Sequence, residues 1–306
     1  MNIILIGDGA AGIQTLRTIS RTGCRVVAVL TSPPSQQARA ASLWDVAQES
    51  GHCVWPAEMV KDPRLADRIA HYQTDIIINI YALYIIHRDV LGAVRVGCFN
   101  VHPGPLPRYA GLNSMCWAIY RGEKTHGVTI HEIVPTVDAG PIVFQSLFPI
   151  DDEETGLQLA TKCIRVGVSL TIQLLEAAIK DPRSIPRIPQ DLSKREYFGR
   201  TVPQGGRLNW QRPARQIVNF IRACDFFPFP SPWGTPRTTL GDQWIGIGKA
   251  SGTGQPVGVS PGSVETLAGS KIRVACADEW ILVHRLLIDG RHIPPAEVLK
   301  TGDRFV

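Results

Sequence analysis

The alternation of short apolar runs with helical segments over residues 1–181 constrains the fold of this chain most strongly. The apolar runs show little polar alternation, which is typical of strands buried on both faces of a parallel sheet. These runs are NIILIG, RVVAVLT, HCVWP, TDIIINIYA and GCFNVH, followed by GVTIHEIV and PIVFQSLFPI as a hairpin pair around PTVDAG. Helices are expected between the runs, at about 11–22, 42–51, 63–72, 114–121 and 155–181. The pattern predicts an α/β fold with a mostly parallel sheet covered by helices.

The composition of the chain changes after Pro182. Residues 183–206 are rich in Pro, Arg and Gly, and we interpret them as a linker. One helix over 212–224 follows, and then short strands separated by turns (WIGIGKA, KIRVACA, WILVHRLLI). The predicted organisation is a main domain over 1–182, the linker over 183–206, and a small β-barrel-like domain over 207–306.

Composition and charge exclude several classes of protein. A hydrophobic content of 44% with 19% charged residues is that of a soluble globular protein. The start MNIILIGDGAAGIQTL resembles no secretory signal, and no apolar run approaches the ~18 residues of a membrane span. The seven cysteines are scattered without a CxxC pair, which argues against structural zinc and fits reduced thiols in the cytoplasm. A net charge of +5 without a long basic run permits an anionic ligand but does not indicate nucleic acid.

The turn GDGAAG places Gly7, Gly9 and Gly12 in a G-x-G-x-x-G pattern between a strand and a helix. This is the context of a dinucleotide-binding turn. The second strand ends in VLTSPP, however, and lacks the acidic residue that would hold the ribose hydroxyls. The glycines are equally explained by tight packing of the first turn against the sheet, so an NAD-dependent oxidoreductase stays an alternative only.

A metal site is the second possibility raised by polar residues, because His102, His126, His131 and Asp138 lie in one stretch of the chain. No pair has HExxH spacing. His126 and His131 are five positions apart in HGVTIH, on opposite faces if that segment is a strand. We therefore predict no metal ligand set.

The segment GCFNVHPGPLPRYAG carries the strongest functional pattern. Alternation along the strand places Cys98, Asn100 and His102 on one face, at the carboxyl edge where open α/β folds place their active sites. The turn TVDAGP between the last two strands can bring Asp138 to the same edge. Amide, imidazole and carboxylate together form an acid/base and oxyanion-stabilising set. The alternative from the pattern alone is a structural His and Asn at the end of a strand.

Five ordered elements extend this pattern: Asn100 with His102, then GPLPRYAG, WAIYRGE, GVTIH, and Asp138 with Gly140. Together they resemble the folate-dependent formyltransferase family, which includes methionyl-tRNA formyltransferase, glycinamide ribonucleotide transformylase and the sugar N-formyltransferases. The stretches GRLNWQRPARQIVNFIRACDFFPFPSPWG and ILVHRLLIDGRHIPPAEVLKTGDRF are similar to the C-terminal domain of that family. The resemblance therefore covers nearly the whole chain.

The resemblance implies a Rossmann-like N-terminal domain, a smaller OB-like C-terminal barrel, and 10-formyltetrahydrofolate as the formyl donor without a metal. The catalytic residues of the family fall on Asn100, His102 and Asp138. Asn100 would donate to the oxyanion, and His102 would either donate to it or take the proton of the amine. Asp138 would orient His102. The implied folate-binding residues are Tyr81, Leu83, Tyr84, Ile85, Gly104, Pro105, Leu106, Pro107 and Val137.

The chain departs from the tRNA-specific members of the family in its first turn and at Ala110, where those enzymes have arginine. The loop over 31–49 contains one basic residue, Arg39, which disfavours tRNA because phosphate contacts supply most of such binding. We expect a small biosynthetic amine, either an amino-sugar nucleotide or a carrier-bound aminoacyl group.

Tyr109, Asn113 and Trp117 are the predicted acceptor-binding residues, although Trp117 is equally explained by packing of its helix. A homodimer is left open. The alternatives to this reading are a methionyl-tRNA formyltransferase, a hydrolase of formyl-folate and the NAD-dependent oxidoreductase. A binding protein without catalysis is disfavoured, because all three polar residues occupy the family positions.

Overall fold

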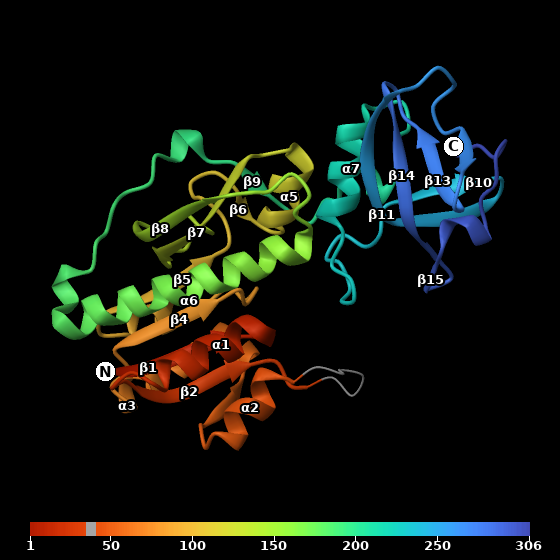
Figure 1. Cartoon of the computed structure of the whole chain (residues 1–306). Coiled ribbons are helices and arrows are strands. Elements are labelled where there is room, and N and C mark those ends of the chain that lie inside the picture. Colours follow the sequence, from red (N-terminus) through yellow and green to blue (C-terminus); the bar gives the residue numbers. More distant parts are fainter. Residues whose placement is uncertain (35–40) are drawn as a thin grey trace. The chain divides into compact units, whose positions relative to one another are not determined.

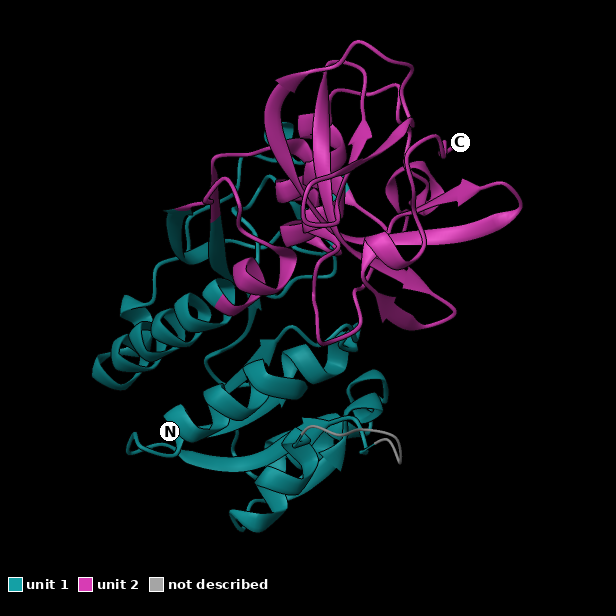
Figure 2. Ribbon diagram, turned by 45° about the vertical axis from the view of Figure 1, so that its right-hand side comes forward, with its two compact units in different colours: residues 1–111, 127–148, 162–197 teal, residues 112–126, 149–161, 198–306 magenta. Residues whose placement is uncertain are grey.

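The computed structural model describes residues 1–34 and 41–306. Arg39, the one basic residue of the loop over 31–49, therefore lies outside the described residues. The chain divides into two compact units, coloured separately in Figure 2. Unit 1 comprises residues 1–111, 127–148 and 162–197, and unit 2 comprises residues 112–126, 149–161 and 198–306. The predicted boundaries at 182 and 206 stay a prediction.

A seven-stranded sheet runs largely through unit 1 (Figure 1). Its strand order is β3 (Val54–Pro56), β2 (Arg25–Thr31), β1 (Asn2–Gly7), β4 (Ile76–Ile80), β5 (Gly97–His102), β7 (Thr125–Glu132), β8 (Ile142–Pro149). The pairs from β3 to β5 are parallel, and β5 pairs with β7 in antiparallel fashion. The prediction of a mostly parallel α/β sheet is confirmed.

Helices connect the parallel strands, as the alternating pattern predicts, and two further helices precede β7 and follow β8. They are α1 (Gly9–Ile19), α2 (Leu43–Glu49), α3 (Leu65–His71), α4 (Arg88–Gly92), α5 (Ser114–Arg121) and α6 (Gly156–Lys180), with the short 3-10 helix η1 (Ala57–Lys61). Apolar residues of β1, β2 and β4 share one buried cluster with residues of α3 and α4. The helix α6 packs over β5 and β7, since a side chain on Gly167 would meet Val101 and Val128.

Side chains from neighbouring elements pack against Gly7 and Gly12 of the GDGAAG turn. A β-carbon on Gly12 would lie 2.5 Å from Leu43 Cδ2, and one on Gly7 would lie 2.8 Å from Ile80 Cγ2. The Asp8 carboxylate accepts hydrogen bonds from Thr31 Oγ1 at 2.7 Å and from the Ser32 N–H at 2.8 Å. These contacts account for Gly7 and Gly12, and a φ of 54° accounts for Gly9, so the turn supports the packing alternative over a dinucleotide site.

Unit 2 contains α7 (Ala214–Ala223) and a separate antiparallel sheet. The strand order is β10 (Arg237–Leu240), β11 (Gln243–Pro256), β14 (Glu279–Ile288), β13 (Lys271–Ala275), β12 (Val264–Leu267), with β15 (Arg291–Ile293) paired to β14. Isolated bridges join Phe305 to Leu240 of β10, and Arg304 to Ser263 beside β12. The second, β-rich domain is confirmed, and its description as an OB-like barrel stays a prediction.

The predicted linker contains local structure of its own. It includes η2 (Pro182–Ser184), η3 (Leu192–Lys194), the short strand β9 (Tyr197–Phe198) that pairs with β6 (Ala110–Gly111), and η4 (Pro203–Gly206). Ile188 bridges to Ile142 of β8. Near the end of the chain, η5 (Pro295–Glu297) follows β15. Within the described part of the chain, no helix combines the length and the apolar character needed to cross a bilayer.

Candidate active site

Three neighbouring strands bring polar side chains together at the end of β5. Asn100 of β5 is the register partner of Asn79 on β4 and of His131 on β7. His102 is the register partner of Thr129. Because partners across a sheet direct their side chains to the same face, the register aligns these groups at one edge of the sheet.

The carboxylate of Asp138 joins this group from the turn between β7 and β8. Its Oδ1 lies 3.2 Å from His131 Nε2 and 3.3 Å from Asn100 Nδ2. Its Oδ2 lies 3.5 Å from His102 Nδ1 and accepts a hydrogen bond of 2.8 Å from the Gly111 N–H. We call Asn100, His102, His131 and Asp138 the Asp138 cluster. Both His102 and Asp138 are more than nine-tenths buried.

The turn that carries Asp138 is held by the segment before β9. Gln190 Nε2 donates to the carbonyl oxygens of Asp138 and Gly140, at 3.0 and 2.6 Å, and Arg195 Nη2 donates to that of Val137 at 3.0 Å. Asp138 itself adopts the left-handed conformation, with φ of 52°, which Asp and Asn tolerate better than most residues. Side chains from distant sequence therefore fix the position of the carboxylate.

The proton positions on His102 follow from its neighbours. Its Nε2 lies 2.7 Å from the Tyr109 carbonyl oxygen, which only accepts, so Nε2 carries a hydrogen. In the neutral ring, Nδ1 is therefore the free lone pair, and it faces Asp138. Burial lowers the pKa of His102 below its ordinary 6.5, although Asp138 and the Tyr109 carbonyl oppose this effect.

Asp138 is held in its charged form. Burial raises the pKa of its carboxyl group, but His102, His131 and the Gly111 N–H act in the opposite direction and prevail. The resulting pKa lies well below the ordinary 3.8. An ionised carboxylate therefore faces His102, whose own pKa is held below 6.5 by burial.

Two family models match the chain in sequence. The formyl transferase model matches residues 1–175, and the model of the formyl transferase C-terminal domain matches residues 201–304. The chain belongs to the formyl transferase family. The resemblance predicted from five motifs is thereby confirmed.

Solved structures share this fold. An N-formyltransferase from Helicobacter canadensis, determined with folinic acid and dTDP-3-aminofucose, is 19% identical with a TM-score of 0.70, over 92% of this chain and 98% of that one. WlaRD, a sugar 3N-formyl transferase determined with dTDP and 5-N-formyl-THF, is likewise 19% identical with a TM-score of 0.70, over 92% and 97%. HypX from Aquifex aeolicus, determined with tetrahydrofolic acid, is 17% identical with a TM-score of 0.66. That match covers 97% of this chain but 46% of HypX, so this formyl transferase spans about half of its length.

Sequence reasoning missed His131 as a member of this site. The spacing of His131 from His126 argues against a metal ligand and indicates no other role, yet His131 contacts both Asn100 and Asp138. The pattern contains a signal, because Thr129 and His131 alternate along β7 and both pair with β5. In the described part of the chain, no group of three or more His, Cys, Asp or Glu side chains is arranged to hold a metal ion.

The loop Gly104–Pro107 of the predicted folate site is fixed beside His102. Thr129 Oγ1 donates to the Gly104 carbonyl oxygen at 2.7 Å, and Gln145 Nε2 donates to that of Leu106 at 2.9 Å. A β-carbon on Gly104 would lie 2.7 Å from His102 Nε2 and 2.9 Å from the Tyr109 carbonyl oxygen. Glycine is therefore needed here to leave room for the hydrogen bond between His102 and Tyr109.

The other predicted folate residues lie on the loop after β4 and in the Asp138 turn. Leu83 and Ile85 are 77% and 67% exposed, and Val137 is also exposed. The hydroxyl groups of Tyr84 and Ser32 lie 3.2 Å apart. Tyr81 has φ of 58°, and its hydroxyl group is buried near Gly167. Leu83, Ile85 and Val137 thus present apolar surface, whereas Tyr81 packs inward.

The predicted acceptor residues have different surroundings. Tyr109 of unit 1 is buried and holds His102 through its carbonyl group. In unit 2, Asn113 adopts φ of 55° before α5. The ring of Trp117 stacks on Phe198, with centroids 4.8 Å apart, and meets Trp233 edge-on at 4.9 Å. This aromatic contact supports the packing interpretation of Trp117.

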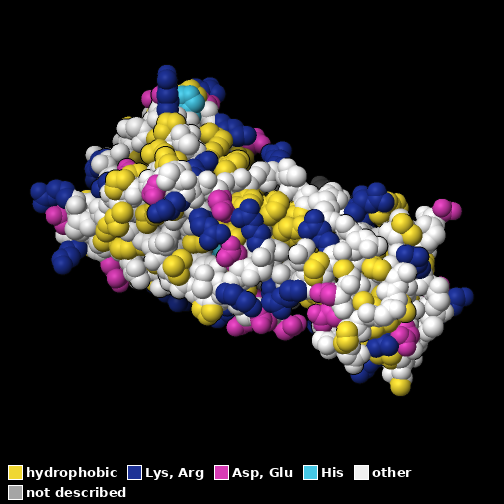
Figure 3. All heavy atoms as spheres, turned by 90° about the horizontal axis from the view of Figure 1, so that it is seen from above, with side chains coloured by type: hydrophobic (Ala, Val, Ile, Leu, Met, Phe, Trp, Pro, Cys, Tyr) yellow, Lys and Arg dark blue, Asp and Glu magenta, His cyan; other side chains and the backbone are white. Residues whose placement is uncertain are grey.

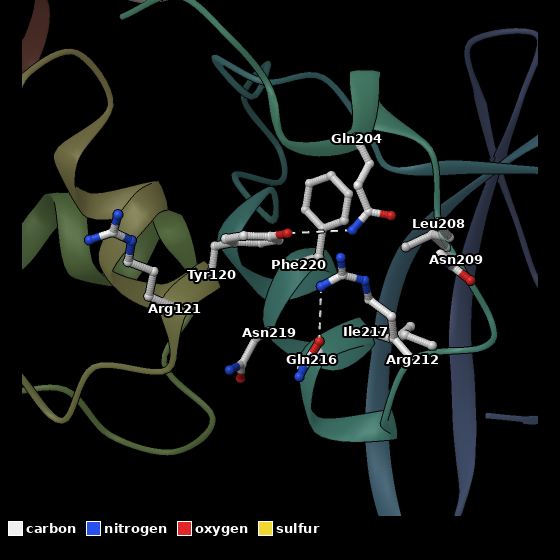
Figure 4. Close-up of a pocket in the computed structure, with 10 residues that line it drawn as sticks. All are labelled: Tyr120, Arg121, Gln204, Leu208, Asn209, Arg212, Gln216, Ile217, Asn219 and Phe220. Carbon is white, nitrogen blue, oxygen red and sulfur yellow. Dashed lines mark hydrogen bonds between the residues drawn. The ribbon is translucent and has the colours of Figure 1, made fainter. Parts of the chain in front are cut away.

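A cavity of about 250 Å³ lies within unit 2 (Figure 4). It is lined by Tyr120, Arg121, Gln204, Leu208, Asn209, Arg212, Gln216, Ile217, Asn219 and Phe220. Several of its polar groups pair with one another, as Arg212 does with Gln216 and Gln204 does with Tyr120. The cavity contains none of the predicted catalytic, folate-binding or acceptor-binding residues.

Proposed function

We propose that this chain transfers the formyl group of 10-formyltetrahydrofolate to the primary amine of a small molecule rather than of an aminoacyl-tRNA, through Asn100, His102 and Asp138. The observation that carries the proposal is the Asp138 cluster in a member of the formyl transferase family. An amide donor and an imidazole, each within 3.5 Å of a charged carboxylate, supply what acyl transfer to an amine requires.

The folate would bind against the exposed apolar loop residues Leu83 and Ile85, with Val137 and the Gly104–Pro107 loop. Apolar surface beside a few fixed polar groups suits a planar ring system such as a pterin. The two sugar-formylating enzymes with this fold were determined with folinic acid or 5-N-formyl-THF, which supports a folate donor here.

In the first step the amine nitrogen attacks the formyl carbon, a C–N bond forms, and the carbonyl electron pair moves to oxygen. Asn100 Nδ2 would stabilise this oxyanion. One of its hydrogens is directed to Asp138 Oδ1 over 3.3 Å, a long contact that the oxyanion can replace. Loss of one such donor typically costs about 3 kcal/mol.

The proton released by the amine would pass to the pair formed by His102 and Asp138. Protonation of His102 at Nδ1 produces an imidazolium that donates to the Tyr109 carbonyl oxygen and faces the Asp138 carboxylate. The intermediate then collapses: the C=O bond re-forms, the bond between the formyl carbon and N10 breaks, and N10 takes the proton held by His102. Of the two roles that sequence left open for His102, this arrangement favours the general base.

The pH dependence of kcat follows from this role. His102 accepts a proton only when it is neutral, and burial lowers its pKa below 6.5. We expect kcat to stay on its plateau as the pH falls through 6.5 and to decline only below it. Steady-state rates from about pH 5 to about pH 9 test this. A decline of kcat that begins above 6.5 would contradict the assignment.

A small amine, in particular an amino-sugar nucleotide, is the acceptor that we favour. Two enzymes with this fold formylate sugars, and their lengths match that of this chain. On the face seen in Figure 3, Lys and Arg side chains lie among Asp and Glu side chains rather than in one continuous basic stripe. A continuous basic stripe is the surface that a phosphate-rich ligand such as tRNA favours.

The acceptor is tested by supplying 10-formyltetrahydrofolate with dTDP-3-aminofucose, an aminoacyl carrier protein or methionyl-tRNA, and identifying the formylated product by mass spectrometry. We expect formylation of the amino-sugar nucleotide. Formylation of methionyl-tRNA alone would overturn the small-molecule assignment while leaving the chemistry of the site intact.

A further inference from the structure

Asn79 is a buried amide in the otherwise apolar strand β4, whose sequence is IIINI. Its side chain has two partners. Nδ2 donates to the Ala82 carbonyl oxygen at 3.1 Å and to Asn100 Oδ1 at 2.8 Å. A buried amide in such a strand costs stability unless its hydrogen bonds are made. The hydrogen bonds of Asn79 therefore indicate that this side chain has a role in the site.

The first end of this hydrogen-bond chain fixes the orientation of both amides. A carbonyl oxygen only accepts, so the atom of Asn79 that faces Ala82 is Nδ2. The same nitrogen lies 2.8 Å from the side chain of Asn100, which must therefore offer its oxygen. The Nδ2 group of Asn100 is left facing the Asp138 cluster.

The second end requires the same orientation. The carboxylate of Asp138 only accepts, and its Oδ1 lies 3.3 Å from Asn100 Nδ2. His131 Nε2 lies 3.0 Å from the same nitrogen of Asn100. The carboxylate therefore calls for an N–H donor from Asn100, which is the orientation that Asn79 also imposes.

We propose that Asn79 is a positioning residue, which holds Asn100 with its NH₂ group toward the reacting formyl oxygen. The proposal rests on the proposed function, since the oriented donor serves the oxyanion. If the side-chain amide of Asn100 were flipped by 180°, its carbonyl oxygen would face the developing negative charge and repel it. Asn79 touches no reacting atom and acts through Asn100 alone.

Two variants that keep the branching of the Asn79 side chain at Cγ separate this role from simple packing. In Asn79→Asp, the ionised carboxylate accepts rather than donates, so it draws the Nδ2 group of Asn100 toward itself. We expect kcat to fall by about 10²-fold, with a smaller change in KM. In Asn79→Leu, Asn100 keeps its contacts with His131 and Asp138, and we expect a loss of about tenfold, the value of one hydrogen bond.

The pH dependence of Asn79→Asp provides a signature that packing cannot produce. At lower pH its buried carboxyl group becomes protonated, and the O–H can again donate to Asn100 Oδ1. The ratio of variant to wild-type kcat is therefore expected to rise as the pH falls, whereas the ratio for Asn79→Leu stays constant. A flat ratio for both variants would overturn the proposal.

A measurement without turnover keeps this test independent of the proposed function. The ¹⁵N signals of the His131 ring report which side of the Asn100 amide lies beside Nε2, 3.0 Å away. In Asn79→Asp the reversed amide presents Oδ1 in place of the NH₂ group, so the Nε2 signal is expected to move from its wild-type position. An unchanged His131 spectrum would contradict the positioning role. Wild-type protein that transfers no formyl group would contradict the proposed function instead.

Asn219 offers a matched control, because it is also a buried amide and lies in unit 2, where it accepts a hydrogen bond from Arg222. Thermal unfolding of Asn219→Leu measures what the loss of a buried amide does to stability. We expect kcat and the His131 spectrum of this control to match the wild type. If they change as they do in Asn79→Leu, the effect of Asn79 is one of stability and the positioning role is wrong.

Discussion

Replacing His102 with Asn is expected to lower kcat for formyl transfer by about 10² to 10⁴-fold, the range that general acid–base catalysis supplies. Asn is shorter than His and its amide takes the place of Nδ1, so the hydrogen bond from Nε2 to the Tyr109 carbonyl oxygen is also lost. The introduced amide has no basic lone pair for the proton of the amine. KM for the folate should change much less, because His102 is almost fully buried.

His71 supplies the control for this variant, since it is an exposed histidine at the end of α3 in unit 1. His71→Asn makes the same chemical change outside the site and should keep the wild-type kcat. Turnover of His102→Asn within a few-fold of wild type, at an unchanged unfolding temperature, would remove His102 from the mechanism.

Replacing Asp138 with Asn is expected to lower kcat by about 10² to 10³-fold. Asn tolerates the left-handed backbone at this position, so the turn should keep its shape and only the charge is lost. Without the carboxylate, the imidazolium of His102 loses the group that stabilises it. The same loss lowers the pKa of His102 further, because Asp138 raises that pKa in the native site.

The pH profile therefore distinguishes this effect from general damage. The acid limb of kcat should move to lower pH in Asp138→Asn than in the wild type. Asp138→Ala adds backbone strain to the loss of charge and should unfold at a lower temperature than Asp138→Asn. An Asp138→Asn variant with an unshifted acid limb and near-normal kcat would show that the carboxylate does not support His102.

Much of the fold could be predicted because its signals are local. The buried strands of unit 1 appear as apolar runs, and α5 begins and ends at the predicted residues Ser114 and Arg121, closed by Gly122 in the left-handed conformation. The helix after β1 begins earlier than predicted, at Gly9. The short helices α4 and η1 carry too few residues to produce a periodic pattern.

The site could be predicted only where its residues carry their own pattern. Asn100 and His102 interrupt an apolar strand, and the spacing of the family motifs points to Asp138. His131 and Asn79 could not be assigned, because their role depends on strand register between segments far apart in the chain. Gln190 and Arg195 fall in a segment interpreted as a linker, and their hydrogen bonds to the Asp138 turn span 52 and 58 residues.

The central claim is tested most directly by measuring tetrahydrofolate release from 10-formyltetrahydrofolate with and without dTDP-3-aminofucose, together with the fate of the formyl group. We predict that release requires the amine and that each formyl group lost from the folate appears on it. Formate released at the full rate without an amine would contradict transfer and indicate a hydrolase. Tight binding of NADH with no binding of the folate would support the oxidoreductase alternative and contradict the account altogether.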